Sequence, residues 1–186
     1  MTGTEPDTSF RFSNGKTIVL CGYLDTETEP VIFSEFVLAV CGQDTIIDFW
    51  GAVFTGNIKF KKDTLLIQEL KYLPIERDFA YKETVWTIEK MYFAKQKLVR
   101  KLLVNRQIPK YSNEKILLVL KEYEAAKPGP DESKTELVYK LFMAAISGSK
   151  TAVKYFKEFE TKFGVDGHLG EEYMELTAML EMWDRK

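Results

Sequence analysis

The chain has 186 residues, of which 45% are hydrophobic and 29% are charged, and its formal net charge is −2. This length and composition are typical of a globular protein that buries enough surface to fold without disulfides or metals, which excludes a disordered or disulfide-stapled class. No segment approaches the roughly 18 uninterrupted apolar residues of a membrane-spanning helix, so we expect that the chain is not a membrane protein.

The first segment, residues 1–7, is polar and acidic. It has neither the basic start nor the apolar centre of a signal peptide, so we expect a cytoplasmic protein. Cys21 and Cys41 are the only cysteines, and each lies in an apolar, strand-like run. That setting predicts two buried thiols and neither a disulfide nor a reactive pair.

Residues 8–75 predict an antiparallel β-meander of five or six strands. Their apolar residues are mostly β-branched or aromatic and come in short runs separated by turn residues. Asn14-Gly15 accepts the backbone angles of a hairpin turn, which places it between the first two strands. The strands are predicted at residues 9–12, 16–23, 31–40, 45–50, 57–61 and 65–70. The strand at 31–40 is apolar on both faces, as expected for a central strand.

After Pro74 the apolar spacing becomes helical, and we expect about five helices. The longest covers residues 83–105, where Val85, Ile88, Met91 and Tyr92 begin a stripe whose members recur three and four residues apart. The others are predicted at residues 112–126, 131–147, 149–163 and 170–183, with Ser112 as an N-cap and Gly148 and Gly164 in C-terminal caps.

Together these elements predict an α+β fold with a sheet part at residues 1–75 and a helical part at residues 76–186. Short joints between the last three helices suggest a helical bundle. Lys127-Pro128-Gly129-Pro130 ends one helix and makes residues 127–131 a linker-like loop. We expect the two parts to pack as one compact unit.

Residue types that carry catalysis or bind metals are scarce. His168 is the only histidine, and it lies in a predicted loop between helices. One histidine and two separated cysteines do not make a zinc site or a nucleophile dyad. Gly51 and Gly56 have the spacing of a phosphate-binding loop, but the lysine that should follow is missing. We therefore expect no cofactor, no metal and no enzyme activity.

Three titratable residues remain candidates for a pocket between the sheet and the helices. Glu35 and Asp48 interrupt apolar strands, so each either faces solvent or lines such a pocket. Lys95 falls inside the apolar stripe of the predicted helix at 83–105. It must extend its ammonium to solvent, pair with a carboxylate or line a cavity.

The middle of the chain is its cationic part, since residues 76–127 hold 12 basic and 7 acidic residues, a net charge of +5. On the predicted helix, Lys90, Lys97 and Lys101 fall on one line opposite the apolar stripe, with Arg100 beside them. Such a line is either a solvated face or a surface for an acidic partner. Aromatic residues that could stack on bases are not interleaved with it, which makes nucleic acid the weaker interpretation.

In size, α+β build and lack of catalytic residue types, the chain resembles, by architecture alone, the small immunity proteins that neutralise bacterial toxins. The leading hypothesis is a non-catalytic cytosolic protein-binding protein that meets an acidic protein surface, with an immunity-type inhibitor of a toxin as one form of it. A small enzyme or ligand-binding protein is the alternative, and a nucleic-acid-binding regulator is the third. The sequence does not indicate the oligomeric state.

Overall fold

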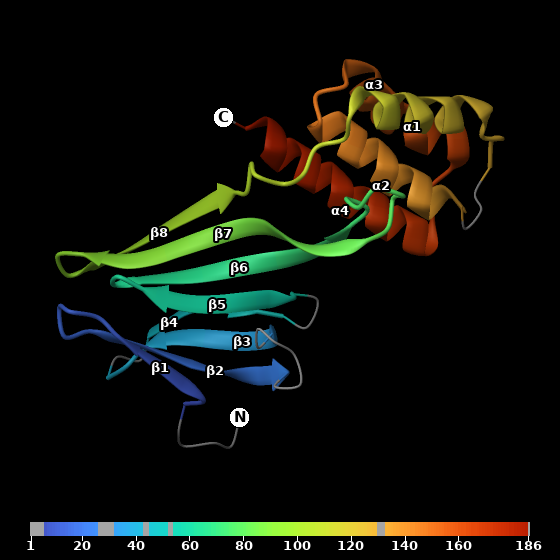
Figure 1. Ribbon diagram of the computed structural model, residues 1–186. Helices are drawn as coiled ribbons and strands as arrows, with labels where there is room; N and C mark the ends of the chain where they lie inside the picture. The colour runs from blue at the N-terminus through green and yellow to red at the C-terminus, as the bar shows by residue number, and fades with distance from the viewer. Residues whose placement is uncertain (1–5, 26–31, 43–44, 52–53, 130–132, 186) are drawn as a thin grey trace. The chain divides into compact units, whose positions relative to one another are not determined.

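A computed structural model describes residues 6–25, 32–42, 45–51, 54–129 and 133–185 of the chain (Figure 1). The fold is α+β, as the sequence predicts, with an antiparallel sheet followed by helices. The chain divides into two compact units. The sheet unit comprises Met1–Lys71 and Thr84–Arg106, and the helical unit comprises Tyr72–Glu83 and Gln107–Lys186.

In the described residues the sheet has eight strands, more than the five or six that the sequence predicts. They pair in the order β1-β2-β3-β5-β6-β7-β8. The strand β4 lies outside this order and pairs with β3. The prediction that the third strand is central is confirmed, because it pairs with three others. The strands are β1 (Thr8–Arg11), β2 (Thr17–Asp25), β3 (Ile32–Val40), β4 (Thr45–Trp50), β5 (Gly56–Lys61), β6 (Thr64–Leu73), β7 (Lys82–Ala94) and β8 (Lys97–Val104).

The helix predicted at residues 83–105 is wrong, because β7 and β8 form an antiparallel hairpin there. The sheet therefore continues past residue 75. Much of the segment is β-branched or aromatic, and such side chains fit a pleated surface. The two strands meet at a two-residue turn in which Lys95 has φ 57°, a left-handed conformation that lysine seldom adopts. No glycine or asparagine marks this turn in the sequence.

One face of the sheet carries the core of the sheet unit. Phe36, on β3, stacks on Trp50 of β4 with ring centroids 4.6 Å apart. Side chains alternate between faces along a strand, and a register shift between β2 and β3 allows both Phe33 and Phe36 to contribute to this face. The buried cluster consists of Phe12, Ile18, Leu20, Phe33, Phe36, Leu38, Leu65, Ile67 and Met91.

Three hairpin turns meet at one end of the sheet. The hairpin predicted at Asn14-Gly15 is confirmed, and its Ser13 amide donates to Asp63 Oδ1 at 2.9 Å in the β5–β6 turn. The Asn14 side-chain amide donates to the Lys95 carbonyl at 3.1 Å in the β7–β8 turn. We call these three turns the turn cluster; they lie at the same end of the sheet (Figure 1).

The described part of the helical unit forms four helices, which correspond to the last four predictions. Ser112 caps the first, since its Oγ accepts a hydrogen bond from the Lys115 amide. Gly164 ends the third with φ 68°, as expected for a C-terminal cap. The second helix is central, with residues 141–146 all buried. The helices are α1 (Asn113–Ala125), α2 (Ser133–Ile146), α3 (Lys150–Phe163) and α4 (Gly167–Asp184).

The linker-like loop predicted at residues 127–131 follows α1, but residues 130–132 lie outside the described part of the chain.

The prediction of two buried thiols is wrong, because Cys41 is exposed and Cys21 is half-buried. Cys41 comes just after the last residue of β3, where the chain turns away from the core.

Candidate functional site: the outer face of the β7–β8 hairpin

The β7–β8 hairpin sorts its charged side chains onto two faces. Lys90 lies opposite Lys101 in the strand register, and Ala94 lies opposite Lys97. Residues that are opposite each other, or two apart, share a face. All three lysines therefore lie on one side, which we call the lysine face; it consists of Ile88, Lys90, Tyr92, Lys97, Val99, Lys101 and Leu103.

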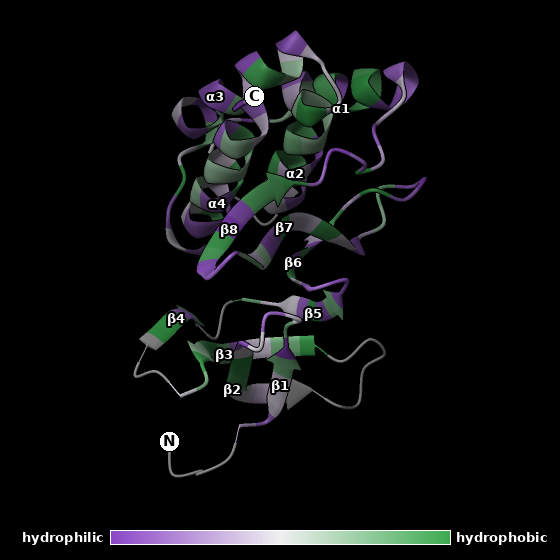
Figure 2. Cartoon of the chain, turned by 90° about the vertical axis from the view of Figure 1, so that its left-hand side faces the viewer, coloured by the Kyte–Doolittle hydropathy of each residue, from purple (hydrophilic) through white to green (hydrophobic). Residues whose placement is uncertain are grey.

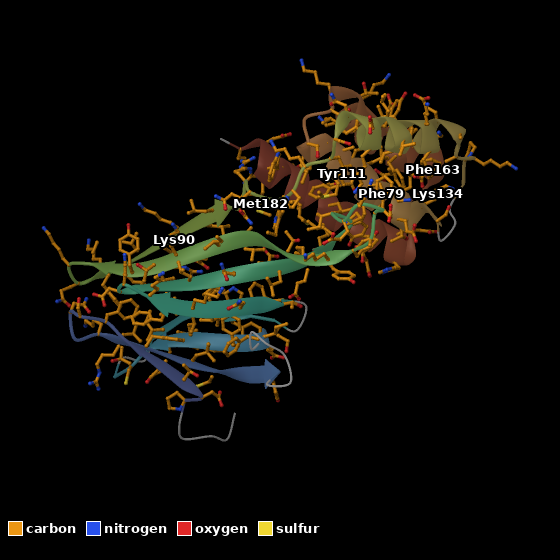
Figure 3. All side chains as sticks on the ribbon, viewed as in Figure 1. Phe79, Lys90, Tyr111, Lys134, Phe163 and Met182 are labelled. Atoms are coloured by element: carbon orange, nitrogen blue, oxygen red, sulfur yellow. The ribbon has the colours of Figure 1, made fainter. Side chains whose placement is uncertain are left out.

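The three lysines of this face are not neutralised. Among the residues that the structure describes, none of them forms an ion pair. Lys97 and Lys101 are exposed, and Lys90 is half-buried on β7 (Figure 3). The Lys101 ammonium lies 5.8 Å from the centre of the Tyr92 ring. Polar and apolar segments alternate along β8 (Figure 2). In the strand register Val99 lies between Lys97 and Lys101 on this face, and Leu103 follows Lys101.

Arg100 lies on the opposite, core face of the same hairpin. Its Nε donates to Glu89 Oε1 at 2.6 Å, and one terminal nitrogen pairs with Asp48. The other terminal nitrogen donates to the Ile47 carbonyl at 3.3 Å. The hydrogen bond to Glu89 raises the pKa of Arg100, burial opposes this, and the Asp48 bond adds to the rise. Grouping Arg100 with the three lysines is therefore wrong.

The three candidate pocket residues are not brought together. Burial acts to raise the pKa of Asp48, but hydrogen bonds from Arg100 and the Phe49 amide lower it overall. Glu35 is half-buried on β3, opposite Tyr23 of β2. Lys95 is exposed in the β7–β8 turn, so its expected place inside an apolar stripe is wrong.

A pocket of about 320 Å³ lies beside Arg100 in the sheet unit. Its walls are mostly apolar, and they come from both β4 and β8. We call it the β4–β8 pocket. Its lining residues are Lys16, Val40, Ile46, Ile47, Phe93, Gln96, Leu98 and Arg100.

The helical unit has a second pocket, of about 630 Å³, at the start of α1. We call it the helix-corner pocket. It includes Phe79, which has φ 61°, a strained backbone conformation for a bulky residue. Cations and carboxylates both line it, beside apolar side chains. The lining residues are Ile75, Arg77, Asp78, Phe79, Lys110, Tyr111, Ser112, Glu114, Lys115 and Leu118.

Lys115 is held at the centre of this corner. Its ammonium lies 4.4 Å from the centre of the Phe79 ring and 4.0 Å from that of Tyr111. The Lys115 Nζ also donates to the Glu76 carbonyl at 2.5 Å. Burial lowers the pKa of Lys115, although Asp78 and Glu76 oppose this. The Tyr111 hydroxyl donates to the Pro74 carbonyl at 2.6 Å, which fixes the ring.

Sequence reasoning missed the partners of these charged groups. Tyr92 and Leu103 join the lysine face only when the segment is a hairpin, and the signal for it was the run of β-branched and aromatic residues near Trp86. Phe79 and Lys115 meet through tertiary packing, for which the sequence carries no local signal.

Within the described ranges, no three His, Cys, Asp or Glu side chains gather as a metal site. None of the helices in those ranges is long and apolar enough to cross a membrane.

In comparisons with known proteins, no family model matches the chain, and neither a curated protein nor a solved structure matches it significantly.

Proposed function

We propose that the chain is a non-catalytic protein-binding protein whose lysine face meets an acidic surface of a partner protein. The observation that carries this proposal is that the two faces of the β7–β8 hairpin differ in the ion pairing of their cations. On the core face, Arg100 is neutralised by two carboxylates. On the lysine face, three lysines have no ion pair among the described residues. Uncompensated charges on one surface attract an oppositely charged partner and speed its association.

The apolar content of the lysine face favours a protein partner over nucleic acid. Tyr92 lies among the lysines, and tyrosine is frequent among residues that dominate binding energy. Val99 and Leu103 add apolar surface, and Leu103 is 43% exposed. A single-stranded nucleic acid needs several stacked rings along a basic groove, whereas this face offers one ring.

An immunity-type role is one form of this proposal. In that role the chain neutralises a toxin by covering an acidic part of its surface. The support for it is the architectural resemblance and the charge of the lysine face. A partner that is a toxin or a secreted protein would favour this form, and a partner of another class would favour a general binding role.

The test reverses the charge of the lysine face. Lys90, Lys97 and Lys101 are changed to glutamate together, and the matched control changes three exposed helix lysines, Lys121, Lys150 and Lys157. Both variants alter the net charge equally. The partner is first isolated by affinity purification from the native cell and then identified by mass spectrometry.

Association rates are then measured at low and at high salt. We expect the lysine-face variant to associate at least about tenfold more slowly at low salt, because steering raises association rates by that order or more. The difference should shrink at high salt, where the screening length falls to about 3 Å at 1 M. Equal rates for the lysine-face and control variants would remove this surface from the interface.

A second candidate function rests on the helix-corner pocket. The strained backbone at Phe79 and the ammonium of Lys115 between two rings are features that occur in ligand sites. Three cations line the same pocket with two carboxylates, Asp78 and Glu114, so its excess positive charge favours a small carboxylate or phosphate compound as the ligand class. Calorimetry with such compounds, on the parent and on Lys115→Met, tests this: binding by the parent alone supports it, and no binding by either rejects it.

A further inference from the structure

The outer edge of β8 carries backbone groups that point away from the sheet. Asn105 donates its amide to the Trp86 carbonyl at 2.8 Å, so this pair faces inward between β8 and β7. In an antiparallel ladder, inward and outward pairs alternate residue by residue. Leu98, Arg100 and Leu102 therefore direct their N–H and C=O groups outward. In the described sheet β8 is a terminal strand, so no further strand takes up these groups.

The side chains along this edge are suited to an acidic segment. β8 carries Lys97 and Lys101 on the lysine face and no carboxylate, while its Arg100 is already paired with Glu89 and Asp48 on the core face. A second copy of β8 laid beside it would bring like charges together, which is destabilising. The opposite end of the sheet, β1, offers no complement either, because it carries Arg11 and no carboxylate. Charge therefore argues against edge-to-edge pairing of this chain with itself and in favour of a different, acidic strand.

An incoming strand would also meet apolar surface on its other side. The β4–β8 pocket opens beside Leu98 and Arg100, the residues whose backbone groups point outward. Its walls include Ile46 and Phe93, which suit an aliphatic side chain. Leu102 is 59% exposed and would lose that exposure against a neighbouring strand.

We propose that β8 accepts an extended segment of a partner protein as an additional strand, with acidic and apolar residues alternating along it. The acidic side chains lie beside Lys97 and Lys101 on the lysine face, and the apolar ones point toward the β4–β8 pocket. Strand addition provides affinity through backbone hydrogen bonds and specificity through alternate side chains. This inference rests on the proposed function, because it names the kind of partner that the lysine face binds.

The experiment uses two synthetic peptides with the full chain. One alternates valine and glutamate over eight residues, and the control replaces every glutamate with lysine. Amide hydrogen exchange is followed by NMR at increasing peptide concentration. The valine–glutamate peptide should slow exchange at Leu98, Arg100 and Leu102 by at least about fivefold, the effect expected of one hydrogen bond per amide. The lysine peptide should leave these amides unchanged.

Two variants separate backbone pairing from charge. Leu102→Pro removes an outward N–H without removing a bond to β7, and proline is tolerated at such edge positions. Leu102→Ala is its control, because it truncates the same exposed side chain and keeps the N–H. The triple change of Lys90, Lys97 and Lys101 to glutamate tests the charges alone. Circular dichroism of each variant confirms that the sheet is retained.

Each outcome has a distinct meaning. Loss of peptide binding in Leu102→Pro, with binding retained in Leu102→Ala, supports strand addition. Equal peptide binding by Leu102→Pro and the parent overturns strand addition. If the variant with Lys90, Lys97 and Lys101 changed to glutamate loses that peptide binding, the proposed function still stands. Equal binding of both peptides, with loss in Leu102→Pro, keeps strand addition and overturns the role of charge. If neither peptide slows exchange at β8, the inference is rejected.

Discussion

Replacing Arg100 by methionine tests whether the ion pairs on the core face stabilise the sheet. Methionine keeps much of the side chain's apolar stem and removes the guanidinium. The Glu89 side chain is only 13% exposed, so its hydrogen bond to Arg100 is largely shielded from water. Asp48 is 43% exposed, so its pair with Arg100 resembles a surface salt bridge.

The two contributions can be estimated separately. A charge-assisted hydrogen bond to a mostly buried carboxylate contributes about 1.5–3 kcal/mol. A surface ion pair contributes about 0.2–1 kcal/mol. Since Arg100 itself is 35% exposed, the lower part of the first range applies. We expect the free energy of unfolding to fall by about 2 kcal/mol in Arg100→Met.

Urea unfolding followed by tryptophan fluorescence measures this change, and Trp50 reports on the region because the Arg100 guanidinium lies 5.9 Å from its ring. Lys101→Met is the matched control, since Lys101 is the next residue of β8 and has no ion pair in the described chain. Its effect should stay within about 0.5 kcal/mol, as for other surface changes. The double variant Glu89→Gln with Arg100→Met should lose less than the sum of the single changes. Equal stability of the Arg100 and Lys101 variants would refute the reasoning.

Two further predictions concern the other residues of this region. Lys95→Gly should raise the free energy of unfolding by about 0.5–1 kcal/mol, because glycine adopts the positive φ of this turn without strain; a decrease in urea unfolding would contradict this. The lowered pKa of Asp48 gives stability that is present above its unfolded value of 3.8 and is lost as pH falls through the folded value. Acid titration of Asp48→Asn should therefore show a weaker loss of stability below about pH 4, with stability at pH 7 within about 1 kcal/mol of the parent; an unchanged acid profile would disagree.

Much of the fold follows from local sequence signals. Asn14-Gly15 marks the first hairpin, and residues 45–50 form β4 with the predicted bounds. Ser112 and Gly164 mark helix ends, because capping depends on a few neighbouring residues. These elements were predictable since their geometry is fixed by residues close in the chain.

The β7–β8 hairpin was not predictable in the same way. Val85, Ile88 and Met91 fit a helical stripe, and the same region also fits an alternating strand. The turn at Lys95 has no glycine or asparagine, so tertiary contacts with the first hairpin, through Asn14, hold an unfavourable φ that no local signal announces. Sheet neighbours decided the structure here, as they often do for strands.

The candidate site was predicted in part, although the prediction placed its lysines on a helix and not on a hairpin. Lys90, Lys97 and Lys101 share a face both on a helix and in the hairpin, because the two-residue turn at residues 95–96 reverses the alternation between β7 and β8. Arg100 distinguishes the two structures. On a helix it lies near the lysines, whereas in the hairpin it points to the core face and meets Asp48, which is 52 residues away in the chain.

The turn cluster also bears on the speed of folding. Most strands pair with their neighbours in sequence, so the hairpins can form early by closing short loops. The contact between Ser13 and Asp63 spans 50 residues, and that between Asn14 and Lys95 spans 81. Such long loops cost more entropy to close, which places these contacts late in folding. The turn cluster therefore acts mainly on the rate at which the sheet opens, and little on the rate at which it assembles.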